Sequence, residues 1–282
     1  MTARTIRTEG AELIVDDTGR DDPALVFLHY WGGSARTWKP VLALLPQRIR
    51  KVAINQRGWG GSRAIDGRYD LDALASDVAA VVAYLGIKRY VVVGHSMGGK
   101  VAQVLAGRGH SGLSGLVLVA PAPPTAMDVP LEVRAGMLAS YQSREGVAQA
   151  LTVLAGPTFD TVHREQVIED TLRGAPEAKR YWPQQGMIVD VSAVLRSLAL
   201  PVDILLGEHD QVERESVLRP LFFSLLPHAT FTVVPDAGHL IPIERPQVIA
   251  SRCERMISVV SQAAQPPCST GAVYLDASNL RD

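Results

Sequence analysis

Short apolar runs alternate along the chain with longer stretches in which apolar residues recur every three or four positions. The segments 5–10 and 11–19 alternate polar and apolar residues, as strands at an antiparallel edge do. Strands that alternate with helices predict an α/β fold, a mostly parallel sheet with helices on both faces. The runs rich in Val, Ile, Leu and Phe that have the length of buried strands are 23–30, 50–55, 89–96, 115–122, 201–208 and 230–238.

The clearest helical stretch covers 70–87. Its apolar residues fall on one face of a helix, Asp70 is suited to cap the start, and Gly86 is suited to end it. The segment 244–260 repeats this spacing near the end of the chain. Both stretches predict amphipathic helices that pack on the sheet.

The alternation is interrupted once, between 123 and 196. Two helix-like stretches, 131–155 and 164–175, have no strand between them, so we interpret this segment as a helical insertion. Two further crossover helices on the sheet are the alternative.

The predicted organisation has three parts and a tail. Residues 1–122 and 197–262 form the two halves of one core, and residues 123–196 form a helical cap. Residues 263–282 lack periodicity and are expected to form a flexible tail.

Composition and charge exclude several classes of protein. A formal net charge of -1 gives no reason to expect nucleic acid or an anionic membrane as a partner. The two cysteines, Cys253 and Cys268, are too few for a disulfide framework and fit a reducing compartment. The first residues lack the apolar core of a signal peptide, and no stretch has the apolar length of a membrane span, so the expected location is the cytoplasm.

The segment 94–98 reads Gly-His-Ser-Met-Gly and lies directly between a predicted strand and a predicted helix. In this context a Gly-x-Ser-x-Gly sequence presents a nucleophilic serine, here Ser96, on a sharp turn. Gly94 and Gly98 lack side chains, so that strand and helix can approach the turn closely. His95, inside the turn, is expected to point away from Ser96.

A serine hydroxyl is a poor nucleophile and needs a base, which in turn needs a carboxylate to fix its tautomer. His239 follows the last predicted strand and Asp210 follows the strand before it. Both are therefore expected at the carboxyl edge of the sheet, where ligands bind in open α/β folds. Asp236, close to His239 in sequence, is the alternative acid, although an aspartate there is better suited to bonding the local turn.

The chain from about residue 5 to 262 resembles the α/β-hydrolase superfamily, in the branch of carboxylesterases and cofactor-free haloperoxidases. The resemblance implies an eight-stranded sheet, a cap inserted after the sixth strand, and the nucleophile–acid–base order Ser96, Asp210, His239. The segments that carry it are HYWGGS at 29–34, NQRGWGGS at 55–62, GHSMGG at 94–99, GEHD at 207–210 and DAGHL at 236–240.

The resemblance also implies two backbone N–H donors to an oxyanion, those of Met97 and Trp31. Relatives usually have glycine where this chain has Tyr30, so the donor loop departs from the family pattern there. Packing inside the protein is the alternative role for each residue predicted to line a substrate pocket. Those residues are Tyr30, Trp59, Tyr141, Tyr181, Trp182 and Met187.

Together these residues predict a carboxylic ester hydrolase that acts through an acyl-enzyme on a small-molecule substrate, with no cofactor and no metal. A lactonase, including one for acyl-homoserine lactones, and a perhydrolase are alternatives on the same site. Ser96 argues against dehalogenation and epoxide hydrolysis, which use an aspartate at that position. From another class, the alternative is a triad-bearing small-molecule receptor or signalling protein with slow turnover. The sequence does not predict the oligomeric state.

Overall fold

The computed structural model describes residues 1–19 and 22–263. Apart from Ala263, the predicted tail lies outside the described residues, and so does Cys268. Nine strands form one sheet in the described chain. They are β1 (Thr2–Arg7), β2 (Ala11–Asp17), β3 (Ala24–Leu28), β4 (Arg50–Ile54), β5 (Arg63–Ala64), β6 (Tyr90–His95), β7 (Leu113–Val119), β8 (Val202–Gly207) and β9 (Thr230–Val234).

The main strands follow the order β1-β2-β4-β3-β6-β7-β8-β9. The pairs from β4 to β9 are parallel, whereas β2 pairs antiparallel with β1, β4 and β5. This confirms the mostly parallel sheet and its antiparallel edge. The resemblance implied eight strands, and the ninth is β5, whose two residues pair with Ala11 and Glu12 of β2.

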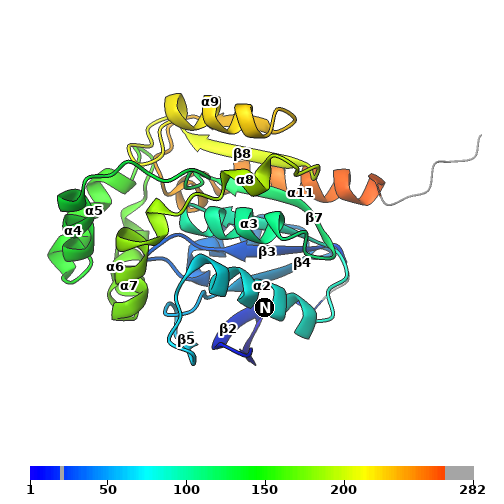
Figure 1. Cartoon of the computed structure of the whole chain (residues 1–282), viewed down its shortest axis with the longest axis horizontal. Helices are drawn as coiled ribbons and strands as arrows, with labels where there is room; N and C mark the ends of the chain where they lie inside the picture. Colours follow the sequence, from blue (N-terminus) through cyan, green and yellow to red (C-terminus); the bar gives the residue numbers. More distant parts are fainter. Residues whose placement is uncertain (20–21, 264–282) are drawn as a thin grey trace, which may run out of the picture.

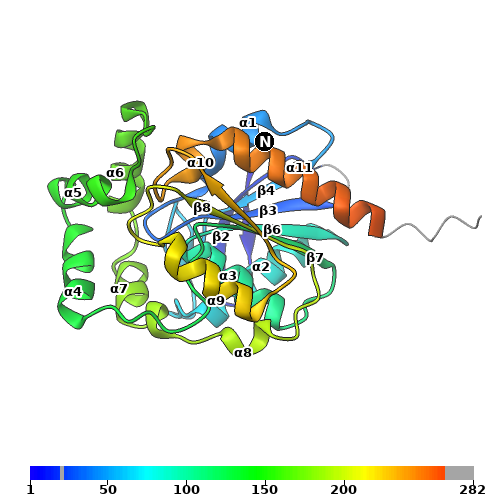
Figure 2. The same ribbon diagram turned by 90° about the horizontal axis from the view of Figure 1, so that it is seen from above.

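Helices cover both faces of the sheet (Figure 2). One face carries α1 (Lys39–Leu44), α10 (Ile241–Glu244) and α11 (Pro246–Ala263). The other face carries α2 (Leu71–Tyr84), α3 (Met97–Gly107), α8 (Ser192–Leu195) and α9 (Glu215–Leu225). Successive side chains of β3 point to the two faces in turn. Leu25 and Phe27 pack on the face that carries α1 and α11, and Val26 and Leu28 pack on the face that carries α2 and α3.

The predicted helix after residue 70 forms as α2. The side chain of Asp70 accepts a hydrogen bond from the backbone N–H of Ala73, as an N-cap does. Gly86 has φ +65°, the left-handed conformation that lets the chain leave the helix. Leu71, Leu74 and Val78 are buried against the sheet, so the predicted apolar face is the packed one.

Between β7 and β8 the chain forms helices and no strand. This segment follows the seventh strand and not the expected sixth, because β5 adds a strand before it. The stems of this segment lie together, because Val191 N–H donates to Pro124 O (2.7 Å) and Met127 N–H donates to Met187 O (3.0 Å). Its first four α-helices lie at one end of the molecule (Figure 1). They are α4 (Leu131–Ser140), α5 (Arg144–Leu154), α6 (Arg164–Leu172) and α7 (Pro176–Gln184), with 3-10 turns at Thr161–His163 and Gly186–Ile188.

Two further expectations concern cysteine and the membrane. Cys253 is buried on α11 as a free thiol. None of the helices in the described ranges combines the length and the apolar character needed to cross a lipid bilayer.

Candidate active site

Ser96 lies at the junction of β6 and α3 in a strained conformation, with φ 52° and ψ −115°. A non-glycine residue in this region costs about 1–3 kcal/mol, and such residues cluster at functional sites. Gly94 and Gly98 allow the turn to form: an added Cβ at Gly94 would lie 2.5 Å from Gly98 O, and one at Gly98 would lie 2.5 Å from Leu28 O. The turn therefore presses the start of α3 against the end of β3.

This close approach gives a test of the turn. Gly98→Ala should destabilise the protein by about 3 kcal/mol, a fall of roughly 10 °C in Tm, because the methyl group meets backbone atoms that cannot move aside. Thermal unfolding followed by circular dichroism measures this. The matched control is Gly136→Ala on α4, where a Cβ meets nothing within 4 Å and a small gain is expected from helix propensity. Equal Tm values for the two variants would contradict the close contact.

His239 and Asp210 are brought together from the loops after β9 and β8. Nδ1 of His239 lies 2.8 Å from Oδ2 of Asp210, and both side chains are buried. The other carboxylate oxygen of Asp210 accepts the N–H groups of Val212 (2.8 Å) and Glu213 (2.9 Å). A carboxylate can only accept here, so the Nδ1 of His239 carries the proton and its Nε2 is left to act as a base.

The backbone around His239 is fixed on both sides. Its N–H donates to Leu154 O at the end of α5 (2.8 Å), and its carbonyl accepts from Nε2 of His95 (2.8 Å). The buried Glu244 accepts the N–H groups of Gly238 (2.9 Å) and Gly156 (3.0 Å) through one carboxylate oxygen. These bonds hold the loop of His239 between the sheet and the inserted helices.

The hydroxyl of Ser96 makes no hydrogen bond to His239 within the described part of the chain. Hydrogen bonds between a nucleophile and its base are often long in a free enzyme and shorten when substrate binds. Ser96 is 7% exposed, so the group is close to the protein interior.

The loop after β3 presents a backbone donor beside this turn. Nε2 of the buried His29 accepts the N–H of Gln56 (3.1 Å), so its proton is on Nδ1, which donates to Tyr30 O (2.7 Å). Burial lowers the pKa of His29 to about 4, which keeps the imidazole neutral. Gly33 N–H also donates to Tyr30 O (3.0 Å). Both bonds fix the peptide group that joins Tyr30 to Trp31. Because a trans peptide group is planar, its N–H, that of Trp31, points away from the bonded carbonyl.

The N–H groups of Trp31 and Met97 donate to no other group in residues 1–19 and 22–263. Met97 opens α3, where backbone N–H groups have no partner inside the helix and the helix dipole favours negative charge. The structure therefore leaves two backbone N–H groups unused, one on the residue directly after Ser96 and one on the loop after β3. Backbone N–H groups of this kind are the donors that an oxyanion site uses.

Tyr30, Trp31 and Tyr141 lie together at this loop. The rings of Trp31 and Tyr141 stack with centroids 3.8 Å apart, and the Tyr141 hydroxyl donates to Trp31 O (3.2 Å). The ring of Tyr30 lies 5.1 Å from that of His95. Thr171 of α6 donates to Gly32 O (3.0 Å). The inserted helices thus hold the carbonyls of the donor loop.

Asp236, the alternative acid, is directed elsewhere. It is exposed, has φ 53°, and forms an ion pair with Arg245 (3.2 Å), while its N–H donates to Glu208 (3.0 Å). Glu208, His209 and Asp236 have ligand atoms within 4.8 Å of one another, so they are the described side chains that could hold a metal ion, and all three are exposed.

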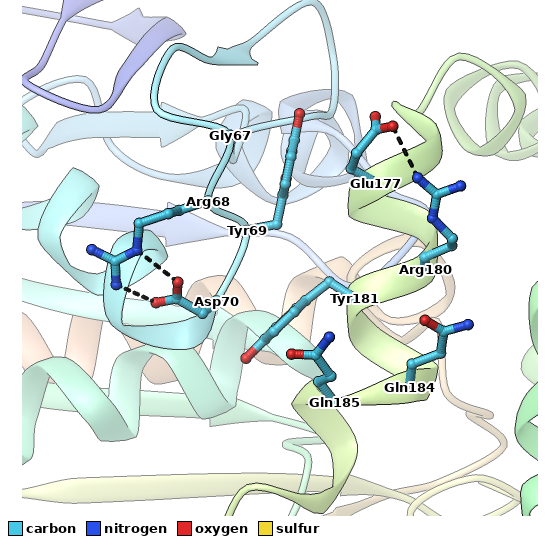
Figure 3. Close-up of a pocket in the computed structure, with 9 residues that line it drawn as sticks. All are labelled: Gly67, Arg68, Tyr69, Asp70, Glu177, Arg180, Tyr181, Gln184 and Gln185. Carbon is cyan, nitrogen blue, oxygen red and sulfur yellow. Dashed lines mark hydrogen bonds and ion pairs between the residues drawn. The ribbon is translucent and has the colours of Figure 1, made fainter.

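The remaining predicted pocket residues have separate locations. Trp59 is buried beside His29, against Gly174, and Trp182 and Met187 are buried in the insertion. Tyr181 lines a polar pocket of about 290 Å³, together with Tyr69 and the ion pairs Arg68–Asp70 and Arg180–Glu177 (Figure 3). None of Ser96, Asp210 and His239 lines that pocket.

Sequence reasoning missed the residues that support the site. His95 was expected only to point away from Ser96, yet it holds the carbonyl of His239. Glu244 also acts through backbone groups, and its bond to Gly156, 88 residues away, has no local sequence signal. Tyr141 was predicted as a pocket residue, but its bond to the carbonyl of Trp31, 110 residues away, was not predicted. His95 is fully buried in the structure, which its place in the Gly-His-Ser sequence did not reveal.

The chain matches known proteins over most of its length. Residues 25–252 match the model of the alpha/beta hydrolase family. The chain is 29% identical over 251 residues to a non-heme haloperoxidase of Rhodococcus erythropolis, covering 82% of this chain and 90% of that one. It is 28% identical over 272 residues to a bifunctional esterase/perhydrolase of Acinetobacter calcoaceticus, covering 86% and 94%. A solved esterase from Exiguobacterium antarcticum has a TM-score of 0.81 at 18% identity, covering 93% of this chain and 100% of that chain, a likeness that shows the fold alone.

Proposed function

The chain belongs to the alpha/beta hydrolase family, and we propose that it hydrolyses carboxylic esters. In this proposal Ser96 is the nucleophile, His239 is the base, and the carboxylate of Asp210 orients His239 and stabilises its charged form. The observation that carries the proposal is the buried bond between His239 and Asp210 (2.8 Å) at the same edge of the sheet as the strained Ser96. Strain at a serine and an oriented histidine are the two features that a serine nucleophile needs.

The proposed reaction has two halves. Ser96 Oγ attacks the ester carbonyl carbon while His239 Nε2 takes its proton, and the N–H groups of Met97 and Trp31 receive the oxyanion. The C–O bond to the alcohol then breaks as His239 returns the proton to the leaving oxygen, which gives the acyl-enzyme. Water repeats the sequence, with His239 as base, and releases the acid and free Ser96. These steps need no cofactor.

We propose that residues 123–196 cap this site and that Tyr30, Trp31 and Tyr141 form one wall of it. Three hydrogen bonds between this segment and the site support the arrangement. The hydroxyls of Tyr141 and Thr171 donate to carbonyls of the loop after β3. The N–H of His239 donates to Leu154 O. We propose that Trp182 and Met187 extend this lining into the cap. Trp59 and Tyr181 are not included, because Trp59 is buried beside His29 and Tyr181 lines the polar pocket of Figure 3.

Perhydrolysis is a second candidate on the same site. It replaces water by hydrogen peroxide in the second half, so that the acyl-enzyme yields a peracid. The relative from Acinetobacter calcoaceticus, whose name gives both activities, favours it. A lactone is a cyclic ester and requires the same groups, so lactonase activity stays a prediction.

A substrate panel tests the proposed function. The purified protein is assayed with 4-nitrophenyl esters of rising acyl length, aryl esters and lactones, each with and without hydrogen peroxide. Turnover of about 1 s⁻¹ or more on an ester supports an enzyme. Stoichiometric acylation followed by very slow release would favour the small-molecule receptor instead, and peracid formation would add the second candidate.

The stacked pair at the donor loop gives a further prediction. Tyr141→Phe keeps the ring against Trp31 but removes the bond to its carbonyl. We expect kcat to fall about tenfold, the effect of roughly 1.4 kcal/mol, with a smaller change in KM. Steady-state kinetics on the best ester measures this, with the exposed Tyr84→Phe as control. An unchanged kcat would show that the cap does not orient the donor.

A further inference from the structure

Two buried charged residues next to the proposed machinery take no part in it. Glu213 is 4% exposed and Lys100 is 0% exposed. Glu213 is three residues after Asp210 and donates its N–H to that carboxylate (2.9 Å). Lys100 is one helical turn after Ser96, and its N–H donates to Ser96 O (3.2 Å). The backbones of both residues are therefore bonded to the residues proposed for catalysis.

The partners of the two side chains differ. Lys100 Nζ donates to Thr125 O (3.2 Å) and Met187 O (3.5 Å), carbonyls on the two stems of the insertion. The Glu213 carboxylate accepts no hydrogen bond from any residue in the ranges the structure describes. It also forms no ion-pair contact with Lys100 there, although each charge influences the pKa of the other.

The charges lie in an environment that disfavours them. Burial lowers the pKa of Lys100 to about 8, against the opposing effect of Glu213. Burial and the negative charge of Asp210 hold the pKa of Glu213 well above its usual range, against the effect of Lys100. Apolar side chains of similar volume often replace buried charged groups without loss of stability, so stability alone is a weak reason for the pair.

Buried polar groups in proteins nearly always have hydrogen-bond partners, and an unsatisfied one is costly. The carboxylate oxygens of Glu213 are not among the side-chain atoms that are both enclosed and unbonded, so a group from outside the protein can reach them. That group must donate a hydrogen bond to Glu213 and can accept one from Lys100. Hydroxyl and amide groups do both, whereas an alkyl chain does neither.

We propose that Glu213 and Lys100 form a polar subsite beside Ser96 that binds a hydroxyl or amide group of the substrate. The inference rests on the proposed ester hydrolysis and narrows its substrates to hydroxy- or acylamino-substituted esters. Glu213 and Lys100 then determine specificity, and the wall of Tyr30, Trp31 and Tyr141 takes the apolar remainder.

The test uses two matched substrate pairs. One pair differs on the acyl side (4-nitrophenyl butyrate and 4-nitrophenyl 3-hydroxybutyrate), the other on the alcohol side (ethyl butyrate and 2-hydroxyethyl butyrate). For the wild type we expect kcat/KM to favour the hydroxylated ester at least tenfold in one pair, because a site built around a hydroxyl discriminates strongly against its absence. The measured quantity is this ratio, which a general loss of activity does not move.

Three variants complete the experiment. Lys100→Met/Glu213→Leu, which removes both charges and keeps the volume, should bring the ratio close to one. Glu213→Gln keeps the shape and should lower the ratio less. Glu215→Gln, an exposed acid two residues further on that pairs with Arg219, is the control and should keep the wild-type ratio. Melting temperatures show that each variant folds.

Each result decides the matter. A wild-type preference that the double variant loses, that Glu213→Gln weakens and that the control keeps supports the subsite. A wild-type ratio near one, or a ratio that the double variant retains, overturns it and leaves the pair with only the role of joining α3 to the stems. If the wild type hydrolyses none of the four esters, the proposed function itself fails and the subsite fails with it.

Discussion

Ser96→Ala is expected to lower kcat/KM for ester hydrolysis by about 10⁴-fold or more, because no other group can then form the acyl-enzyme. The fold should be preserved, since Ser96 Oγ makes no hydrogen bond to another described residue. Ester hydrolysis and circular dichroism of the purified variant measure the two effects.

Covalent labelling gives an independent readout of the same residue. A fluorophosphonate should add one adduct to the wild type and none to Ser96→Ala, and peptide mass spectrometry locates the adduct. Ser258→Ala, on the outer part of α11, is the control and should label normally. If Ser96→Ala hydrolysed esters at the wild-type rate, the proposed active site would be wrong.

Asp210→Asn is expected to reduce kcat by about 10⁴-fold, and the geometry gives the reason. One oxygen of Asp210 accepts the N–H groups of Val212 and Glu213, so the oxygen of an asparagine takes that position. Its NH₂ group then faces Nδ1 of His239 and donates to it. The imidazole proton moves to Nε2, where the base is needed, and the negative charge that stabilises the imidazolium is lost.

The matched control for this variant is Asp236→Asn. Asp236 is exposed and bonded to Arg245, so its variant should keep most of the activity. The two variants are compared by kcat on one ester, with thermal unfolding to confirm that both fold. A large loss of kcat in Asp236→Asn and a small loss in Asp210→Asn would show that Asp236, not Asp210, is the carboxylate partner of His239.

Most of the fold could be predicted from the sequence because its elements have strong local signals. The buried strands are continuous apolar runs, and α2 has both a capping aspartate and a terminating glycine. The strand β5 could not be predicted, since two residues of mixed character carry no periodicity and pair only because β2 passes beside them.

The same distinction holds within the site. Ser96, Asp210 and His239 were predicted as candidates because each follows a strand, and parallel strands end at one edge. The structure adds the bond between His239 and Asp210. The support by His95, 144 residues before His239 in the chain, depends on two loops meeting in space and has no counterpart in local sequence.

The paired glycines beside Glu244 set a condition on engineering this protein. An added Cβ at Gly156 would lie 2.2 Å from Gly238 N, and one at Gly238 would lie 2.4 Å from Gly156 N. A chimera that receives its helical insertion from a relative therefore needs a glycine at the position of Gly156, just after α5. It also needs Glu244, whose carboxylate accepts the N–H of that glycine. Without both, we expect a transplanted insertion to displace the loop of His239, the proposed base, and the hybrid to lose activity as well as its original specificity.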